Sequence, residues 1–532
     1  MSYVSLYDTT LRDGTQGEGI SLSVADKLAI CKRLDELGVH YIEGGWPGSN
    51  PRDAEFFERA KSLRLANATL TAFGSTRRAN ICADEDANLA ALLEAETPVV
   101  TLVGKSWDLH VTRVLETSLE ENLAMISDSV AYLVGQGRRV FFDAEHFFDG
   151  YKANAHYAVQ TVRAAEVAGA ECVILCDTNG GMMPDEISAI VHQVRQRSSV
   201  ELGIHTHNDA DMAVAGAIAA VRAGATQVQG TMNGYGERCG NANLVSLIAN
   251  LKIKMGVECV SDTQLASLTE ASRYVAEVAN MPTLSSQPYV GGSAFAHKGG
   301  LHAAAVSKVE HSYQHIQPRS IGNDKRVLVS DLSGRGNILW RARELCPDAE
   351  LTQAQARQLL QEIKERENQG FQYEGAEASF ELLVRRMQPG YTAPFSLVDF
   401  VSMVEKRSNG NDNGAKDPHD IASQVMLKVR VGDEVMHTAA SGNGPVNALD
   451  HALRKALEQF YPQLKDVRLL DYKVRIVDQG GGTGSVVRVL IDSTDGKRTW
   501  STVGSSENII EASWYALADS LELWLAREAV SS

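Results

Sequence analysis

The feature that most constrains the fold of this chain is a regular alternation of two kinds of segment in its first 260 residues. Short β-branched or apolar runs recur eight times, with segments of helical spacing between them. The runs are 3–8, 39–43, 69–73, 98–103, 139–143, 172–177, 202–206 and 226–230. Such alternation implies parallel strands with right-handed crossovers, and eight repeats in this length favour a closed (β/α)8 TIM barrel. A doubly wound sheet is the alternative, but no G-x-G-x-x-G motif follows the first run.

The remainder of the chain predicts smaller parts. A charged helix is expected over 352–367, after Pro/Gly-rich loops, and the polar run KRSNGNDNGAKDPH has nothing to anchor a core. The predicted domains are a barrel over 1–280, small helical and mixed linker subdomains over 281–405, a flexible linker over 406–419 and an α+β domain over 420–532.

The C-terminal α+β domain contains an internal repeat. Residues 425–457 and 471–521 each predict strands followed by a helix, and Gly442 and Gly504 open the two helices 62 residues apart. One such unit cannot bury its sheet face alone, so we expect the two copies to pack together. The glycine-rich helix starts fit either an anion site, because backbone N–H groups are free there, or tight closure between packed units.

Charge and cysteine content exclude several kinds of partner. Acidic residues outnumber basic ones by 67 to 51, and a net charge of −16 opposes binding to nucleic acid. No apolar run reaches the roughly 20 residues that span a bilayer, and no secretory signal begins the chain, so no membrane partner is expected. Seven scattered cysteines fit a reducing compartment, and we predict a cytoplasmic protein.

Polar residues follow four of the predicted barrel strands, whose carboxyl ends meet at one face. The His-x-His at 205–207 places both imidazoles on one side of its strand, because strand side chains alternate. A His-x-His alone is more typical of a polar strand end, but a nearby carboxylate and amide oxygen complete a shell suited to a divalent metal. The predicted ligands are Asp13, His205, His207 and Asn241.

Two further features suggest chemistry at that face. Arg12 adjoins a predicted ligand, and its fork of N–H donors could stabilise an oxygen that gains negative charge. It could equally form a salt bridge with Glu43 or Glu237, and both roles are compatible. Beyond the barrel, AFAHKGGLH (294–302) predicts either a loop that reaches over a site and offers a proton-accepting histidine, or ordinary surface residues.

Together these motifs resemble the acyl-CoA-dependent 2-oxoacid condensing enzymes of the isopropylmalate/homocitrate/citramalate synthase family, which are DRE-type metal-dependent barrel lyases. The motifs are DTTLRDGTQ (8–16), EGG (43–45), DTNGG (177–181), HTHND (205–209), GYGERCGN (234–241) and AHKGGLH (296–302). The resemblance covers essentially the whole chain, and FFDAEHFFDGY (141–151) is most similar to the citramalate synthase branch. It implies condensation of acetyl-CoA with pyruvate, assisted by Mg²⁺, Mn²⁺ or Zn²⁺.

Other activities remain as alternatives. The nearest is 2-isopropylmalate synthesis from 2-oxoisovalerate, but the family's HSSGIHQDG and SPED-type patterns read HKGGLHAAA (297–305) and DAEHFFDG (143–150) here. A barrel lyase that cleaves a carbon–carbon bond would not need the long C-terminal domain. A non-catalytic amino-acid sensor would have little use for Arg12 and the metal-ligand set.

The resemblance also implies roles for individual residues. The implied metal ligands are Asp13, His205, His207 and Asn241, the implied substrate-binding residues are Arg12, Gln16, Glu43 and Thr178, and the implied catalytic residues are Arg12, Glu145, Glu237, His302 and Tyr313. Arg12 would stabilise the enolate or the 2-oxoacid carbonyl oxygen, Thr178 would bind the carboxylate, and His302 would assist proton transfer. In the family the residues after the barrel enter the partner's active site, which implies a homodimer. The C-terminal domain would be regulatory and bind an amino acid, isoleucine for a citramalate synthase and leucine for the alternative.

Overall fold

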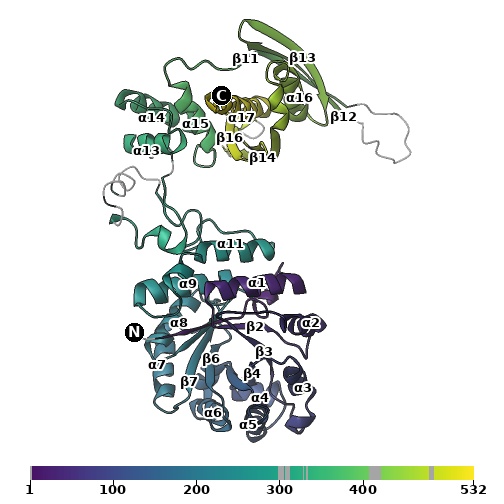
Figure 1. Ribbon diagram of the computed structural model, residues 1–532, viewed down its shortest axis with the longest axis vertical. Helices are drawn as coiled ribbons and strands as arrows, with labels where there is room; N and C mark the ends of the chain where they lie inside the picture. Colours follow the sequence, from purple (N-terminus) through teal and green to yellow (C-terminus); the bar gives the residue numbers. More distant parts are fainter. Residues whose placement is uncertain are drawn as a thin grey trace, which may run out of the picture. The chain divides into compact units, whose positions relative to one another are not determined.

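The structure is a computed structural model (Figure 1). It describes residues 3–297, 305, 309, 312–327, 329–330, 333–406, 421–477 and 484–531. The chain forms two compact units. The first contains residues 1–295 and 315–325, and the second contains residues 296–314 and 326–532.

The first unit is a closed barrel of eight parallel strands in sequence order (Figure 1). The strands are β1 (Ser5–Asp8), β2 (Tyr41–Gly45), β3 (Thr69–Ser75), β4 (Val99–Lys105), β5 (Arg139–Glu145), β6 (Cys172–Asp177), β7 (Glu201–Thr206) and β8 (Gln227–Gly230). Closure comes from parallel pairing of β1 with both β2 and β8. The (β/α)8 prediction is therefore confirmed, and each of the eight predicted runs overlaps one of these strands.

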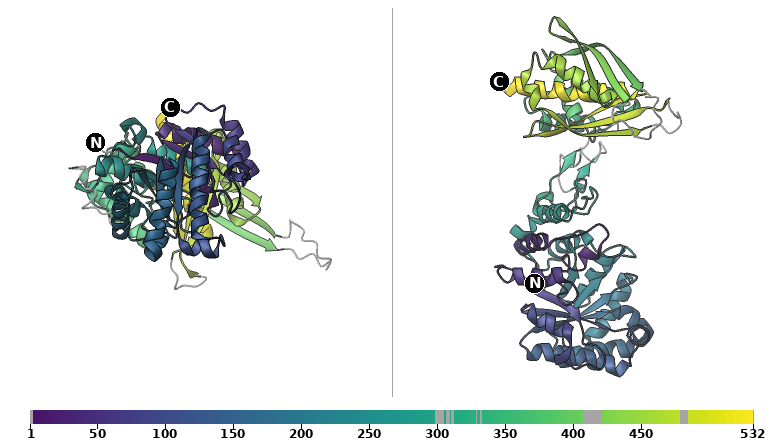
Figure 2. Two further views of the ribbon diagram at one scale, coloured as in Figure 1. Left: turned by 90° about the horizontal axis from the view of Figure 1, so that it is seen from below. Right: turned by 90° about the vertical axis from the view of Figure 1, so that its right-hand side faces the viewer.

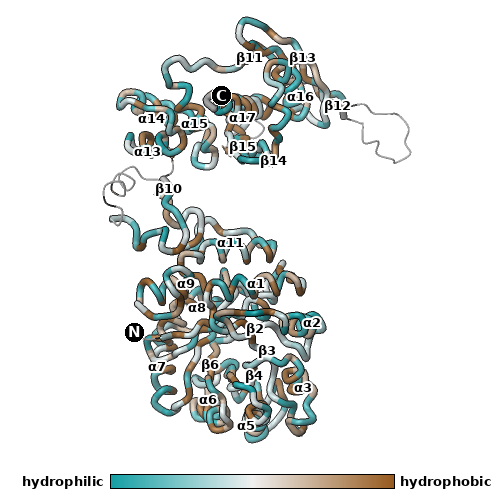
Figure 3. Tube along the Cα trace, viewed as in Figure 1, coloured by the Kyte–Doolittle hydropathy of each residue, from teal (hydrophilic) through white to brown (hydrophobic). Residues whose placement is uncertain are grey.

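Helices connect and surround the barrel strands. They are α1 (Val24–Leu37), α2 (Pro51–Ala60), α3 (Ala87–Glu94), α4 (Asp108–Arg113), α5 (Leu119–Gly135), α6 (Phe147–Ala168), α7 (Pro184–Arg195), α8 (Ala213–Arg222), α9 (Leu244–Ala249), α10 (Asp262–Leu265) and α11 (Leu268–Val278). Local chemistry sets their ends. Ser23 and Asp26 form a capping box at the start of α1, and Gly38 ends it in the left-handed region at φ 87°. Teal and brown alternate along these helices in Figure 3, as amphipathic helices on a barrel require.

The barrel interior changes character along its axis. Alternate strand residues fill one part with an apolar cluster that includes Tyr7, Val99, Phe141 and Ile174, all at most 1% exposed. Toward the carboxyl ends of the strands the inward positions become polar, as at Glu43, which is fully buried. A packed apolar layer thus lies beneath a layer of polar side chains, at the face of the barrel where TIM-barrel active sites lie.

The second unit contains helices and two three-stranded sheets. Its elements are β9 (Ala296–His297), β10 (Arg326–Val327), α13 (Arg335–Leu345), α14 (Gln353–Asn368), α15 (Glu377–Arg386), β11 (Ser396–Lys406), β12 (Ile421–Val431), β13 (Glu434–Gly442), α16 (Pro445–Leu457), β14 (Arg468–Ile476), β15 (Val487–Thr494), β16 (Thr499–Ser506) and α17 (Ile509–Ser531). The helix expected over 352–367 is confirmed by α14, whose N-cap Thr352 forms a capping box with Gln355.

The internal repeat is a pair of βββα units. The first is β11–β12–β13 with α16, and the second is β14–β15–β16 with α17. The helices α16 and α17 pack on their own sheets and on each other, and Figure 2 shows them between the two sheets. The first sheet begins at Ser396, ahead of the predicted linker over 406–419, because β11 pairs with β12. Of that linker, Lys406 ends β11 and the remainder lies outside the described residues.

The two repeat glycines are explained by close packing of helix on sheet. A Cβ atom on Gly504 would lie 1.9 Å from the Ala512 carbonyl oxygen, and one on Gly442 would lie 2.5 Å from the Ala448 nitrogen. Of the two roles considered from the sequence, these distances favour closure between packed elements. Among the helices that the structure describes, none combines the length and the apolar character needed to cross a bilayer.

Candidate active site

Three side chains of metal-ligand type converge at the carboxyl end of the barrel. Asp13 follows β1, His205 lies in β7, and His207 follows that strand. Their ligand atoms all lie within 4.8 Å of one another, and the residues are 3%, 5% and 7% exposed. His205 Nε2 is 3.3 Å from both Asp13 Oδ2 and His207 Nε2. Two imidazole nitrogens and a carboxylate oxygen therefore face one small space.

Asn241, the fourth predicted ligand, is held against the same strand end. Its backbone pairs with His207 in an antiparallel bridge, and its Nδ2 donates to the Tyr235 carbonyl oxygen at 3.1 Å. Its Oδ1 is buried and has no hydrogen-bond partner within the described part of the chain. A buried acceptor without a donor is costly unless something else binds it. This orphaned oxygen, with the three converging ligand atoms, fits a divalent cation.

The electrostatics of the cluster favour the ligand-ready protonation states of Asp13 and His207. Burial would raise the pKa of Asp13, but the charge of Arg12, the hydrogen bond to His205 and the charges of the two histidines together hold the pKa well below its usual range. Burial and the neighbouring His205 lower the pKa of His207 to about 3. Burial would lower the pKa of His205, but the hydrogen bond to Asp13 and the charge of Asp13 raise it above its usual value. Asp13 is thus a carboxylate and His207 is neutral at pH 7, as metal ligands must be.

Arg12, whose side chain is 15% exposed, forms an ion pair with the fully buried Glu43 beside this cluster. Its Nε donates to Glu43 Oε1 at 2.6 Å, and its guanidinium lies 3.9 Å from the centre of the Phe73 ring. The second oxygen of Glu43 accepts from Tyr7 Oη at 2.5 Å. Of the two salt-bridge partners considered from the sequence, the structure has Glu43. Arg12 Nη1 lies 3.6 Å from Asp13 Oδ1.

Two more predicted residues lie at the carboxyl ends of β5 and β6. Glu145 ends β5 and pairs with Lys105, which ends the neighbouring β4. The Thr178 hydroxyl accepts from the His146 backbone N–H at 2.9 Å. Arg238 donates to the Thr178 carbonyl oxygen at 2.7 Å and connects β6 to the segment after β8.

The remaining predicted residues are more peripheral or undescribed. Gln16 ends a short 3-10 turn, η1 (Gly14–Gln16), and is exposed, as is Glu237. Tyr313 belongs to the second unit and is 50% exposed. His302 lies outside the described residues.

Three polar residues on inward strand positions are not among the site residues predicted from the sequence. Lys105 and Asp143 lie in β4 and β5, and Gln229 lies in β8. Asp143 and Gln229 are 3% and 0% exposed and hydrogen-bonded to each other at 3.1 Å. The available signal was the period-two position of each polar residue within an otherwise apolar strand, since such a residue must point into the barrel.

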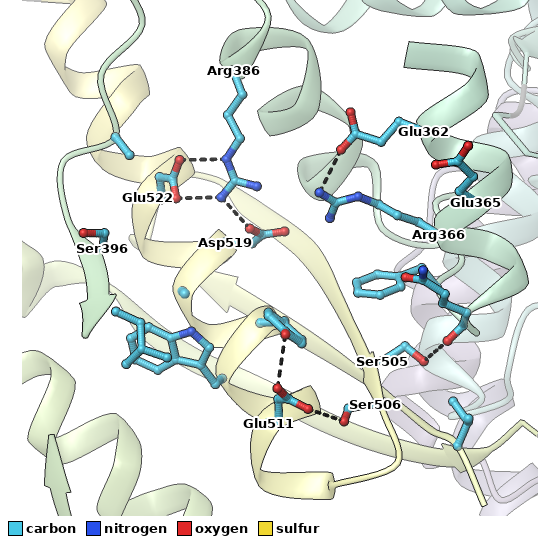
Figure 4. A pocket seen from close by; sticks show the side chains of 18 of the residues that line it. Glu362, Glu365, Arg366, Arg386, Ser396, Ser505, Ser506, Glu511, Asp519 and Glu522 are labelled. Carbon is cyan, nitrogen blue, oxygen red and sulfur yellow. Dashed lines mark hydrogen bonds and ion pairs between the residues drawn. The ribbon is translucent and has the colours of Figure 1, made fainter. Parts of the chain in front are cut away.

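A separate cavity of about 920 Å³ lies within the second unit (Figure 4). It is lined by α14, the ends of α15 and β16, the start of β11 and α17. Arg386 forms ion pairs with Glu522 and Asp519, and Glu511 accepts from Ser506. Trp514 adds an aromatic wall. Both charge signs lie beside an aromatic surface, and the described residues that line this cavity include no cluster like that of Asp13, His205 and His207.

Comparison with known proteins decides the family. Residues 3–275 match the HMGL-like family model, 289–370 the homocitrate synthase post-HMGL domain-like model, and 374–525 the LeuA allosteric (dimerisation) domain model. The chain is 54% identical to (R)-citramalate synthase of Geobacter sulfurreducens, over 98% of this chain and 97% of that protein. It is 51% identical to that of Aquifex aeolicus, over 99% and 98%. The chain belongs to the citramalate synthase family.

Membership of the citramalate synthase family also weighs against the nearest alternative. A probable 2-isopropylmalate synthase of Methanopyrus kandleri is 31% identical over 96% of each chain, well below the 54% and 51% of the two citramalate synthases named above. Among solved structures, hydroxymethylglutaryl-CoA lyase from Pseudomonas aeruginosa aligns with 53% of this chain and 94% of its own, at 20% identity and a TM-score of 0.45.

Proposed function

We propose that this protein is an (R)-citramalate synthase. Acetyl-CoA, pyruvate and water would give citramalate and free CoA. The observation that carries the proposal is the buried Asp13–His205–His207 cluster beside the Arg12–Glu43 pair, in a chain 54% identical to a citramalate synthase over nearly its full length. The relative named as a probable 2-isopropylmalate synthase is more distant, at 31% identity.

The predicted ligands would hold a divalent cation at the barrel face. Asp13, His205 and His207 supply three ligand atoms, and Asn241 supplies the orphaned oxygen. When bound, such a cation polarises the 2-oxoacid carbonyl as a Lewis acid. Because Asp13 stays ionised and His207 neutral at pH 7, little proton release should accompany binding at these two residues.

Arg12 would stabilise the charge that develops on the 2-oxoacid oxygen. Glu43 and Phe73 fix its guanidinium before substrate arrives, so little reorganisation is needed during the reaction. Thr178, at the end of β6, would bind the 2-oxoacid carboxylate, with Gln16 and Glu43 contributing to the substrate site. Glu145 would face the same pocket from β5, where Lys105 holds its carboxylate.

The reaction also needs proton transfers. A base must remove a proton from the acetyl methyl group, and the methyl carbon then bonds to the carbonyl carbon of pyruvate. The former carbonyl oxygen gains a proton, and water cleaves the thioester to release CoA. We assign proton transfer to His302 with Tyr313 and Glu237 in support, on the family motif, with His302 and Tyr313 acting in the partner's active site.

The test is CoA release by metal-stripped protein, followed with a thiol reagent. Acetyl-CoA is offered with pyruvate, 2-oxobutyrate, 2-oxoisovalerate or 2-oxoglutarate, each with and without Mg²⁺ or Mn²⁺. We expect metal-dependent release that is fastest with pyruvate. Fastest release with 2-oxoisovalerate would move the assignment to 2-isopropylmalate synthase. No release with any acceptor would overturn the condensation reaction.

We further propose that the second unit binds a regulatory amino acid, with isoleucine as the effector. The match of residues 374–525 to an allosteric domain model supports this. Isoleucine should inhibit CoA release at concentrations where leucine has little effect. Stronger inhibition by leucine would reassign the effector, and no inhibition by either would contradict the proposal.

A further inference from the structure

A buried hydrogen-bond chain leads from the metal-ligand cluster into the barrel. His205 Nδ1 lies 2.8 Å from Gln229 Oε1, and Gln229 Nε2 donates to Asp143 Oδ1 at 3.1 Å. The three residues come from β7, β8 and β5 and are 5%, 0% and 3% exposed. At this depth every polar atom of the chain needs a partner from the protein itself.

The Gln229 amide controls where His205 carries its proton. His205 Nε2 faces Asp13 and His207, so this nitrogen must keep a free lone pair to bind a cation. The proton of a neutral imidazole then belongs on Nδ1, where an acceptor must meet it. The amide oxygen of Gln229 is such an acceptor. If the amide were turned over, its NH₂ group would face Nδ1 and force the proton onto Nε2.

Asp143 determines which way the amide faces. An ionised carboxylate only accepts hydrogen bonds, so the Gln229 NH₂ group must point toward it and the oxygen toward His205. We propose that Asp143 is a positioning residue that orients the Gln229 amide and thereby keeps the Nε2 lone pair of His205 available to a cation. The proposal rests on the role of His205 as a metal ligand. It concerns only this ring, because His207 Nδ1 is buried with no hydrogen-bond partner among the described residues.

The proposal predicts an unusual pattern of loss and rescue. In Asp143→Asn the new amide can donate or accept a hydrogen bond, so it no longer fixes which way the Gln229 amide faces. Partners of this kind typically contribute 10–100-fold to metal affinity, and we expect Mn²⁺ to bind about 10-fold more weakly. In the double variant Asp143→Asn/Gln229→Glu, the new carboxylate always accepts from His205 and is itself satisfied by the NH₂ group that the Asp143→Asn substitution introduces. Affinity should therefore return toward the wild-type value.

The experiment measures Mn²⁺ affinity of the full-length chain by calorimetry at pH 8. That pH is chosen because burial raises the pKa of Asp143 to about 7. Long-range ¹H–¹⁵N spectra of ¹⁵N-histidine protein report the tautomer of His205, whose signal is assigned with His205→Ala. Asp143→Asn should show Nε2–H character at His205, and the double variant should show Nδ1–H. Thr161→Val is the matched control. It removes a buried 2.9 Å hydrogen bond to Ser106, and this bond is not part of the hydrogen-bond chain from His205 to Asp143.

Each outcome decides between distinct conclusions. Wild-type affinity and an Nδ1–H tautomer in Asp143→Asn would overturn the proposal. The proposal would also be overturned if the double variant is folded, as judged by its thermal transition, and still binds Mn²⁺ as weakly as Asp143→Asn does. If either variant fails to fold, Gln229→Glu alone keeps the acceptor for His205 and should retain the Nδ1–H tautomer, and an Nε2–H signal there would overturn the proposal. Unchanged Mn²⁺ affinity in His205→Ala would show instead that the metal-site assignment itself is wrong.

Discussion

At the scale of single residues, the site depends on a few buried charges that hold one another. Arg12 is fixed by Glu43 on one side and lies over Phe73, while its charge keeps Asp13 ionised. Removing one member of a buried charged pair leaves the charge of the other without a partner, so the effect of such a substitution is not confined to the residue that is changed. Conservative substitutions among these residues are therefore the informative ones.

Arg12→Lys tests the stabilisation of negative charge. Lysine keeps the positive charge but has no fork that can bind Glu43 and a substrate oxygen together. We expect kcat for CoA release to fall about 10²–10³-fold, the usual cost of losing one such donor. Mn²⁺ affinity should change little. Arg139→Lys, in an exposed ion pair with Glu171, is the control and should keep wild-type kcat. A loss of less than threefold in Arg12→Lys would exclude this role.

The depressed pKa of His207 predicts a pH-dependent contribution to stability without metal. Burial, and then the charge of His205, lower its folded pKa from 6.5 to about 3. Between pH 6 and 5 the unfolded chain takes up a proton at His207 and the folded chain does not, so its contribution falls with pH. Relative to His207→Asn, the wild-type free energy of unfolding should drop by about 1 kcal/mol over this interval. Urea titrations of both proteins at pH 6 and pH 5 measure this drop. If the free energy of unfolding changes equally in wild type and in His207→Asn, the low folded pKa of His207 is contradicted.

At the scale of elements, the second unit depends on helices that lie very close to their sheets. Both repeat glycines are positions where a strand meets its helix with no space for a side chain. The equivalent contact in both copies explains why the glycines recur 62 residues apart in the sequence. An ion pair also joins two helices of this unit, since Arg386 in α15 pairs with Glu522 in α17.

Gly504→Ala tests this close packing. Its Cβ atom would overlap the Ala512 carbonyl oxygen, so α17 must shift away from β16. Such overpacking typically costs about 1–3 kcal/mol, and the thermal transition of the second unit should fall accordingly. Gly336→Ala, which meets nothing within 4 Å in α13, should be neutral or slightly stabilising. Equal effects of the two substitutions would argue against a packing role for Gly504.

At the scale of the whole molecule, the proposed active site draws on two chains. His302 is assigned to the partner's site, whereas Arg12 lies in the barrel with the predicted metal ligands. Two different inactive variants should then complement each other. In a statistical mixture half of the dimers carry one copy of each variant, and one of their two sites has both residues intact.

Co-expression of Arg12→Lys with His302→Ala measures this complementation. Each variant alone should release CoA at a small fraction of the wild-type rate, whereas the mixed preparation should recover about a quarter of it. The two chains carry different affinity tags so that mixed dimers can be purified. Purified mixed dimers that are no more active than the single variants would show that His302 acts within its own chain, or not at all.

Much of this organisation is determined by the sequence itself. The alternation of apolar runs and helical segments is local, and it predicts the eight barrel strands because each repeat must bury its apolar face in the same way. Placing Asp13, His205 and His207 at one face then follows from parallel strands, whose carboxyl ends must meet. The helix over 352–367 was also readable, because its capping box and spacing lie within the segment.

Other features required the tertiary structure, because they join residues that no local pattern relates. The pairing of Glu43 with Arg12, rather than with another cation, depends on how neighbouring strands are staggered around the barrel. Gln229 and Asp143 are 86 residues apart in the sequence but hydrogen-bonded in the structure, so neither position alone predicts a hydrogen-bond chain to His205. The strand β11 was missed because a long polar segment separates it from β12, and only pairing across that segment makes it part of the first sheet. Local patterns determine elements and the face where they end, whereas the partners of buried charges are decided by packing.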